Sequence, residues 1–306
     1  MMYHSRQKYY HPKQILSALK KTREDYNEPD TGAILKDVYN AKTKLVRAQR
    51  SGRTPLEHLY YELIRSNYLY ESKKDSNNTL THLFFAHPES IRLAQIYHHV
   101  VLLDCTYKTN VFRYPLLHIV GMTATNQVFS IAFCFQRSEK EEDYIWSLNQ
   151  LNKIWTPLAI PRTFVTDREL ALMKAIEKTL PNSHNIICIW HINKAIMARC
   201  KKYFESEEKW VKFFTLWMRI VESSTEGSLL EAYDNLRAST KSYPDVEDYL
   251  LLTWMPHMEH FVKVYTSNSP HFGNSTTSRV EGSHSRIKSF LQNSTGDFLQ
   301  VFQSIS

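Results

Sequence analysis

Residues 100–104 read Val-Val-Leu-Leu-Asp, a short apolar run that starts with β-branched residues and ends in one acidic residue. A second run, Thr-Phe-Val-Thr-Asp, occupies residues 163–167 and ends in the same way. Short, continuous apolar runs of this kind are typical of strands buried on both faces of a sheet. The sequence therefore predicts two buried strands whose last residues, Asp104 and Asp167, are carboxylates.

The segments around these two runs alternate between strand and helix patterns. A strand at 114–124 and another at 128–135 are joined by a short polar turn, which is typical of a hairpin. Ser138 and Glu141 are predicted to form a capping box at the start of a helix. From residue 100 on, the order β-β-β-α-β-α-β-α predicts a mixed α/β fold with a central sheet covered by helices. The remaining predicted elements of this core, which spans 79–204, are strands at 79–85 and 185–189 and helices at 170–180 and 192–204.

Residues 1–72 are basic and show helical patterns. One helix is predicted to end near residues 27–30, a second to span 31–49, and a third to begin with Thr-Pro-Leu-Glu at 54–57. The first fifty residues hold 11 Lys and Arg against 5 Asp and Glu, a net charge of +6 out of +7 for the whole chain. Such a region favours a polyanionic partner. A solvated segment or supporting bundle without a partner is the alternative.

The composition limits the classes of protein that fit. A chain of 306 residues with 42% hydrophobic residues can bury a substantial core, as one large domain with an insertion or as two domains. It has only 7 glycines and no glycine-rich phosphate-binding loop. The four cysteines lack the spacing of a disulfide framework, and there is no secretory signal and no run of about 18 apolar residues. We therefore expect a soluble intracellular protein with reduced thiols and no membrane partner.

Residues 205–275 interrupt the alternation with helical patterns rich in tryptophan and tyrosine, which predicts an α-helical insertion. Its aromatic side chains either pack within the insertion or stack on unpaired bases. A polar loop then leads into residues 276–306, which are predicted to form a C-terminal helix that completes the core. Glu281 lies in the first turn of this helix.

Asp104, Asp167 and Glu281 are the candidate catalytic residues. Two carboxylates at the ends of neighbouring strands, with one from a helix beside them, can hold two divalent metal ions that stabilise a phosphodiester displacement. Each residue also has a structural alternative. Asp104 is then a loop-entry residue, and Asp167 lies in the first turn of a helix capped by Thr166 and Glu169. Glu281 is then the partner, in a capping box, of the serine three residues before it.

Cys188 and His191 form a Cys-x-x-His pair, which could supply half of a zinc site. The chain has no second pair with matching spacing, and Cys200 and His184 are poor completions. The alternative is that Cys188 packs under the sheet while His191 orients a polar network near the start of a helix. The residues alone leave both interpretations open.

Three motifs, in order and spacing, resemble a known family. They are Leu-Asp-Cys-Thr-Tyr-Lys-Thr-Asn at 103–110, Phe-Val-Thr-Asp-Arg-Glu at 164–169 and Cys-Ile-Trp-His at 188–191. The interval is 63 residues from Asp104 to Asp167 and 21 residues from there to Cys188. On these motifs, residues 100–195 resemble the transposase domain of Mutator-like elements, the MULE domain.

The resemblance implies an RNase H-like α/β fold: a mixed sheet flanked by helices and interrupted by the α-helical insertion. It also implies an Asp-Asp-Glu triad that binds Mg²⁺ or Mn²⁺. Asp104 and Asp167 match the first two acidic positions, and Glu281 matches the third, with Glu259 as the fallback. These carboxylates are therefore the expected catalytic and metal-binding residues.

The same resemblance implies the partners. Members of the family bind terminal inverted repeats, cut the element free and join its 3′ ends to target DNA. Double-stranded DNA is therefore the expected partner and the nucleus the expected location, and a homo-oligomer is compatible with this. Cys188 and His191 match the family's Cys-x-x-His motif, which is thought to support the site. Many relatives carry an upstream zinc-binding domain, whereas the first cysteine here is Cys105, so terminal-repeat recognition either comes from residues 1–72 or is missing.

Three functions are compatible with the resemblance. The first is a metal-dependent transposase, which the retained Asp104, Asp167 and Glu281 favour. The second is a transposase-derived transcriptional regulator that binds DNA without cutting it, like the plant far-red-response factors that resemble this family. The third is an inactive element remnant, which the missing zinc finger and the short C-terminal end favour.

Overall fold

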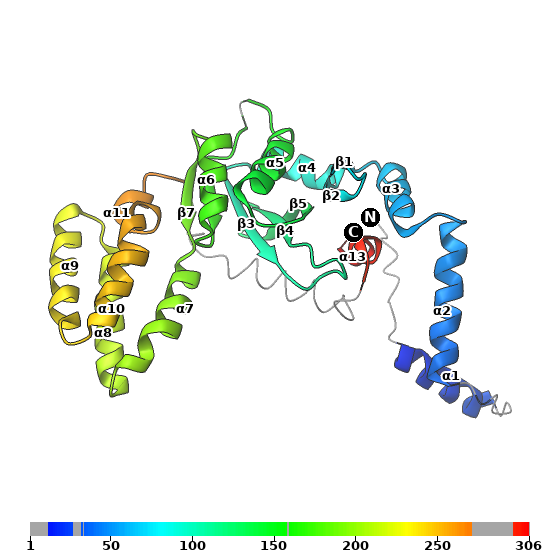
Figure 1. Ribbon diagram of the computed structural model, residues 1–306, viewed down its shortest axis with the longest axis horizontal. Helices are drawn as coiled ribbons and strands as arrows, with labels where there is room; N and C mark the ends of the chain where they lie inside the picture. The colour runs from blue at the N-terminus through cyan, green and yellow to red at the C-terminus, as the bar shows by residue number, and fades with distance from the viewer. Residues whose placement is uncertain (1–11, 27–31, 33, 158, 271–295, 306) are drawn as a thin grey trace. The chain divides into compact units, whose positions relative to one another are not determined.

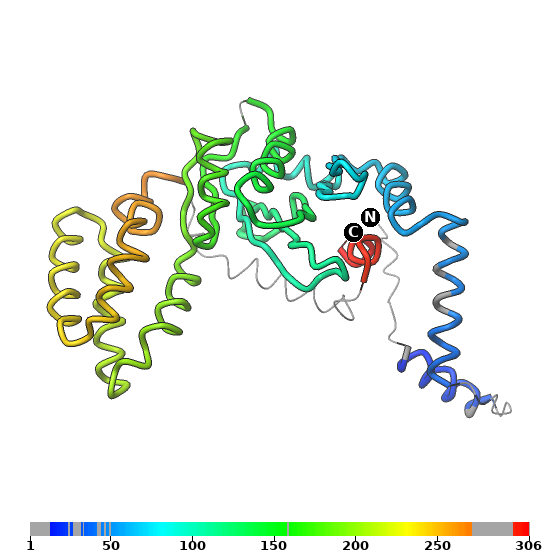
Figure 2. The backbone as a smooth tube through the Cα atoms, in the orientation of Figure 1, coloured from blue at the N-terminus to red at the C-terminus, as the bar shows by residue number. Residues whose placement is uncertain are grey.

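The computed structural model describes residues 12–26, 32, 34–157, 159–270 and 296–305, and Figure 2 traces the backbone. The chain forms two compact units, Met1–Tyr61 and Glu62–Ser306. All four cysteines carry free thiols, in agreement with their spacing. In the described part of the chain, no helix is both long and apolar enough to cross a membrane.

The first unit is helical where it is described. It contains α1 (Pro12–Tyr26), α2 (Leu35–Arg50) and the start of α3 (Pro55–Arg65). The helix start predicted at 54–57 is confirmed, because the two side chains and backbones bond reciprocally. The backbone N–H of Thr54 donates to Glu57 Oε2 at 2.7 Å, and that of Glu57 donates to Thr54 Oγ1 at 3.3 Å.

A seven-stranded sheet lies at the centre of the described part of the second unit (Figure 1). Its strands run in the order β1-β2-β5-β4-β3-β6-β7. β1, β2, β5, β4 and β3 are each antiparallel to the next, whereas β3, β6 and β7 are parallel. The predicted mixed sheet is therefore confirmed. The strands are β1 (Leu69–Lys74), β2 (Leu80–Ala86), β3 (Val100–Thr106), β4 (Leu116–Met122), β5 (Val128–Gln136), β6 (Thr163–Thr166) and β7 (His184–Ile187).

The sheet is packed on both faces. Because side chains alternate along a strand, Val101 and Leu103 of β3 join the core under three helices, whereas Val100 and Leu102 belong to a cluster on the opposite face. On that opposite face, Phe298 of the C-terminal helix packs against β5, with its ring 4.5 Å from that of Phe135. The helices are α4 (Pro88–Ile96), α5 (Glu141–Asn152) and α6 (Leu170–Thr179) over the first face, and α13 (Phe298–Ile305) on the second.

The structure differs from the sequence prediction at two elements. Strand β1 forms at Leu69–Lys74, where the pattern indicated the end of the helical region and a polar break. Helix α4 was not predicted; Pro88 occupies its first turn and His87 Nδ1 accepts from the backbone N–H of Glu89 at 3.2 Å. Both elements are short, and each depends on neighbouring parts of the sheet for its burial.

Both capping boxes predicted in the core are wrong. The cap of α5 is Lys140, and Ser138 Oγ instead donates to the carboxylate of Asp143. The cap of α6 is Glu169, so Asp167 precedes the helix and does not lie in its first turn. The structural alternative for Asp167 therefore does not hold.

The helical insertion packs against α7 (Ile189–Cys200) and the end of β7 in one hydrophobic cluster, which includes Trp210, Trp217 and Trp254. All three tryptophans are buried, so the packing interpretation of these side chains is confirmed. Arg168 Nε donates to the backbone oxygen of Thr253 at 3.2 Å and joins the insertion to the end of β6. After α7 (Ile189–Cys200), the described elements are α8 (Glu207–Glu222), α9 (Glu226–Thr240), α10 (Pro244–Tyr249), 3-10 helices at Lys201–Tyr203 and Met255–His260, a π-helix at Leu250–Trp254, and α11 (Lys263–Thr266).

Candidate active site

Asp104 lies on β3, two residues before the strand ends, and is 8% exposed. It pairs in register with His118 of β4 and shares the strand face of Leu102. The loop-entry interpretation is therefore wrong, because the residue is part of a central strand with neighbours on both sides. The sheet fixes the backbone from which this carboxylate extends.

Asp167 follows β6 directly, on the parallel strand beside β3. Leu102 pairs in register with Val165, the last pair between the two strands, and Asp104 and Asp167 each lie two residues further along the chain. Paired parallel strands are about 4.8 Å apart, so the segments that lead to the two acidic residues are adjacent at Leu102 and Val165. Both lie at the carboxyl ends of their strands, which is where open α/β sheets place their sites.

Glu139 is a further acidic group at this edge, and its role was missed from the sequence. Tyr107 Oη donates to Glu139 Oε1 at 2.7 Å and to Oε2 at 2.8 Å, and Tyr144 Oη donates to Oε1 at 3.1 Å. Cys105 Sγ lies 3.5 Å from the Tyr144 hydroxyl. The residue follows β5 in a segment that reads as a helix cap, so no sequence signal distinguished it from an ordinary helix-start glutamate.

The electrostatics of this edge are unfavourable to further negative charge. Burial raises the pKa of Asp167 to about 6, and the neighbouring carboxylates of Glu169 and Glu139 add to the shift. Burial likewise raises the pKa of Tyr107 and, strongly, that of Cys105. Cys105 is therefore an uncharged thiol here. A cation near Asp167 would favour the ionised form of the Asp167 carboxyl.

The third predicted carboxylate, Glu281, lies outside the described residues. The fallback, Glu259, is not brought to the carboxyl edge of the sheet. Its Oε1 lies 3.4 Å from His260 Nε2, and His260 Nδ1 lies 2.8 Å from the backbone oxygen of Asn185, near the amino end of β7. Glu259 therefore does not belong with Asp104 and Asp167.

Cys188 is fully buried at the start of α7, and its backbone N–H donates to the oxygen of Thr166 at 2.7 Å. It packs with Leu102 and Val165 on one face of the sheet, so the interpretation that it lies under the sheet is confirmed. His191 is in the first turn of α7, with its ring 4.8 Å from that of Trp190.

The zinc interpretation gains nothing from the described residues, where no three His, Cys, Asp or Glu side chains gather as metal ligands. The same holds at the carboxyl edge, where Asp104 and Asp167 are two carboxylates and the described residues show no cluster of three. Carboxylate oxygens are the ligands that Mg²⁺ and Mn²⁺ prefer, and Asp104 and Asp167 supply them from fixed strand ends. The buried carboxylate of Asp167 would also gain from a bound cation.

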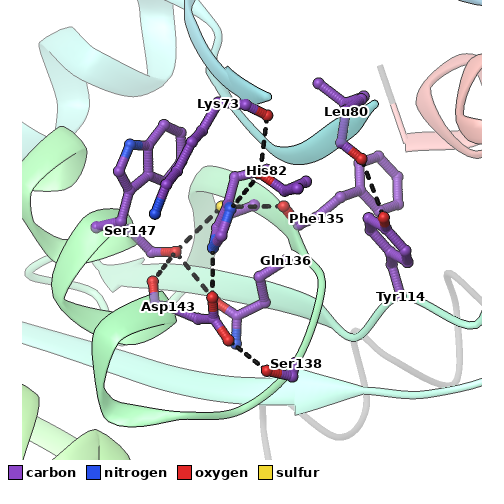
Figure 3. A network of polar contacts seen from close by, with 12 residues as sticks. Lys73, Leu80, His82, Tyr114, Phe135, Gln136, Ser138, Asp143 and Ser147 are labelled. Carbon is purple, nitrogen blue, oxygen red and sulfur yellow. Dashed lines mark hydrogen bonds and ion pairs between the residues drawn. The ribbon is translucent and has the colours of Figure 1, made fainter. Parts of the chain in front are cut away.

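A buried polar network anchors the start of α5 (Figure 3). His82 Nε2 on β2 lies 3.0 Å from Asp143 Oδ1 on α5, and their side chains are 2% and 9% exposed. Ser147 Oγ donates to Gln136 Oε1 of β5 at 3.0 Å. Burial lowers the pKa of His82, and Asp143 opposes that shift. The network ties two strands to the helix that Glu139 precedes, and so it supports the placement of that carboxylate.

The two acidic residues thus lie near the carboxyl ends of adjacent parallel strands in a mixed α/β domain. Residues 100–195, which run from β3 into α7, match the family model of the MULE transposase domain. This segment of the chain is therefore similar to the MULE transposase domain. The matched segment contains Asp104, Asp167, Cys188 and His191.

Similar proteins include two from Arabidopsis thaliana. Protein FAR-RED IMPAIRED RESPONSE 1 is 23% identical over 241 residues, which cover 76% of this chain and 28% of that protein. Protein FAR1-RELATED SEQUENCE 5 is 22% identical over 173 residues, covering 55% of this chain and 22% of that protein. A segment of the PKS-NRPS hybrid synthetase cheA of Chaetomium globosum is 24% identical over 295 residues, covering 87% of this chain and 6% of the synthetase. The chain thus spans less than a third of each of these relatives.

Proposed function

We propose that this chain is a DNA transposase of the Mutator-like type, which cleaves transposon ends and joins them to target DNA. The observation that carries the proposal is the placement of Asp104 and Asp167 at the carboxyl ends of adjacent parallel strands, within the segment that matches the MULE domain. Two acids in this arrangement suit phosphodiester chemistry assisted by metal ions.

An RNase H-like core is part of the proposal. Its support is the strand order β5-β4-β3-β6-β7. Three consecutive antiparallel strands are followed by two parallel ones, and each of the parallel strands is preceded by a helix, α5 or α6. This order puts the strands that lead to the two acids next to each other, although 63 residues separate the acids in the sequence.

Asp104, Asp167 and Glu281 are the proposed ligands of Mg²⁺ or Mn²⁺. Bound ions would stabilise the attacking and leaving oxygens of the phosphodiester displacement. Asp104 and Asp167 would hold them from strand ends that cannot move independently of the sheet. Glu139 and Glu169 add negative charge around Asp167, which favours a cation there. Cys188 and His191 are proposed to support the site from the start of α7.

Double-stranded DNA is the proposed partner, and the nucleus the proposed location. The N-terminal helices would supply the sequence-independent part of the affinity, because their cations can neutralise phosphates. A homo-oligomer is compatible with this proposal. Six exposed cations on α1 and α2 are Lys13, Lys20, Lys21, Lys36, Lys44 and Arg47.

Replacing these six cations by glutamine in the full chain is expected to weaken DNA binding and flatten its salt dependence. Each phosphate that the variant no longer neutralises should reduce the slope of log K against log salt by about 0.9. Fluorescence anisotropy of a labelled duplex at several NaCl concentrations measures both quantities. Replacing Lys212, Lys241 and Lys263 of the insertion serves as the control. An unaltered slope in the sixfold variant would remove the proposed role of α1 and α2.

A second candidate function is DNA binding without cleavage, as a transposase-derived regulator. The observation that favours it is the similarity to the two FAR1-type proteins of Arabidopsis thaliana, which covers more than half of this chain in both cases. This alternative keeps the fold and the DNA partner but assigns no catalytic role to the acids.

Cleavage of DNA separates the two functions. The full chain is incubated with labelled duplexes that carry the sequences flanking its own gene, with Mg²⁺ or Mn²⁺, and the products are resolved on a denaturing gel. A transposase yields strand breaks at the element end that disappear with EDTA. Retention of the duplex in a mobility shift without any strand break would support the regulator and reject the transposase.

A further inference from the structure

The loop that joins β3 to β4 exposes apolar and basic side chains together. Val111 and Phe112 are adjacent and are 52% and 53% exposed. Lys108 and Arg113, which are also exposed, lie on either side of them. Apolar residues scattered singly are ordinary on a protein surface, but an adjacent pair between two cations is a feature of a binding surface for a ligand with apolar and anionic parts.

Buried polar groups hold this loop in one conformation. Thr109 and Asn110 are buried, at 0% and 1% exposure. Asn110 Nδ2 donates to the backbone oxygen of Tyr114 at 2.7 Å, and the N–H of Tyr114 donates to Asn110 Oδ1 at 3.1 Å. The N–H of Val111 donates to the backbone oxygen of Gly296 at 2.9 Å. The exposed tip is therefore preorganised, and a ligand need not order it on binding.

The ring of Phe112 is supported by other aromatic rings. Its centroid lies 4.7 Å from that of Phe298 on α13 and 6.5 Å from that of Tyr114. Phe298 and Tyr114 are themselves in contact, with centroids 5.4 Å apart. Phe112 thus rests on a fixed aromatic base while about half of its surface stays open to a stacking partner.

The loop also borders the candidate active site. It starts at Tyr107, three residues after Asp104, and the Tyr107 hydroxyl donates to both oxygens of Glu139. Glu139 in turn lies close enough to Asp167 to raise the pKa of that carboxyl. The loop that carries the apolar tip therefore begins at the same edge of the sheet as the proposed catalytic acids.

We propose that this loop binds an unpaired base at the DNA end that is being processed, with Phe112 stacking on the base and Lys108 and Arg113 contacting the flanking phosphates. An aromatic ring stacks on an unpaired base but does not reach the face of a base inside a duplex stack. The cations add sequence-independent affinity for the backbone. The inference rests on the proposed function and specifies its substrate as a DNA end with unpaired nucleotides.

The test compares two labelled DNAs of equal sequence, one fully paired and one with three unpaired nucleotides at its end. Their affinities for the full chain are measured by anisotropy in EDTA, so that no cleavage occurs. Phe112→Ala should weaken binding to the unpaired end by about 5- to 100-fold, and to the paired duplex by less than about twofold, because a stacked base contributes roughly 1–3 kcal/mol. Phe112→Trp should keep the preference. Lys108→Gln and Arg113→Gln should weaken binding to both DNAs.

Leu252→Ala is the matched control, because Leu252 is 79% exposed and lies in the insertion; it should leave both affinities unchanged. Equal affinity of the wild-type chain for the two DNAs, or equal weakening of both by Phe112→Ala, would overturn the inference. A preference for unpaired ends without cleavage in Mg²⁺ would reject the transposase and leave the inference intact. Cleavage in Mg²⁺ without a Phe112-dependent preference for unpaired ends would support the transposase and overturn the inference.

Discussion

Replacing Asp104 or Asp167 by asparagine is expected to abolish metal-dependent DNA cleavage by the full chain. Each substitution removes a charged oxygen donor from the adjacent strand ends while keeping the side-chain volume. Even the outer partners of metal ligands contribute 10- to 100-fold, so loss of a ligand should reduce the rate by roughly a hundredfold or more. Single-turnover cleavage of a labelled duplex, with Mg²⁺ or Mn²⁺ varied, measures this loss.

Both variants should remain folded, so the loss of cleavage would come from the missing carboxylate and not from unfolding. Burial already favours the neutral form of Asp167, whose pKa is about 6, and a neutral asparagine fits that environment. Glu259→Gln is the matched control: its carboxylate is 71% exposed and lies away from the carboxyl edge, so cleavage should persist. Glu281→Gln should behave like the two aspartate variants. Full cleavage by Asp104→Asn or Asp167→Asn would reject the proposed site.

Asp143→Ala is expected to destabilise the fold by about 1–3 kcal/mol, because it leaves the buried His82 side chain without its hydrogen-bond partner. The Ser138 hydroxyl would also lose its acceptor. The free energy of unfolding, measured by urea denaturation at neutral pH, reports the change. The effect should propagate to the start of α5 and hence to the placement of Glu139.

The exposed pair Arg92–Glu89 provides the comparison for that variant. Its atoms lie 2.9 Å apart, but its side chains are 60% and 55% exposed. Glu89→Ala should therefore change stability by no more than about 1 kcal/mol. Similar losses in Asp143→Ala and Glu89→Ala would show that burial of the His82 pair contributes nothing to the fold.

The buried strands of the core were predictable from short segments of sequence. β3 and β6 lie between other strands and are buried on both faces, so residues 100–104 and 163–167 read as continuous apolar runs. β1 is different because it is an edge strand whose last four residues are exposed. Its polar sequence, Leu-Tyr-Glu-Ser-Lys-Lys, carries no such signal. It forms a strand because its backbone pairs with that of β2.

The start of α6 shows how pairing in the sheet overrides a local motif. Thr166 and Glu169 have the spacing of a capping box, but Thr166 stays in β6, where its backbone oxygen accepts from the N–H of Cys188. The helix therefore starts later, at Leu170, with Glu169 as its cap. Asp167 is left between strand and helix, which is the position that a ligand at the strand end requires.

The order of residues along the chain established the two acidic strand ends, the helical insertion and the basic N-terminal helices, because burial and charge leave periodic marks that can be recognised locally. It could not place Glu139 at the carboxyl edge of the sheet or orient the loop that carries Phe112. Those positions arise from hydrogen bonds and ring contacts between segments far apart in sequence: Tyr107 with Glu139, and Phe112 with Phe298. Interactions of this kind form only when the strands and helices pack together in the folded protein, since no single segment contains both partners.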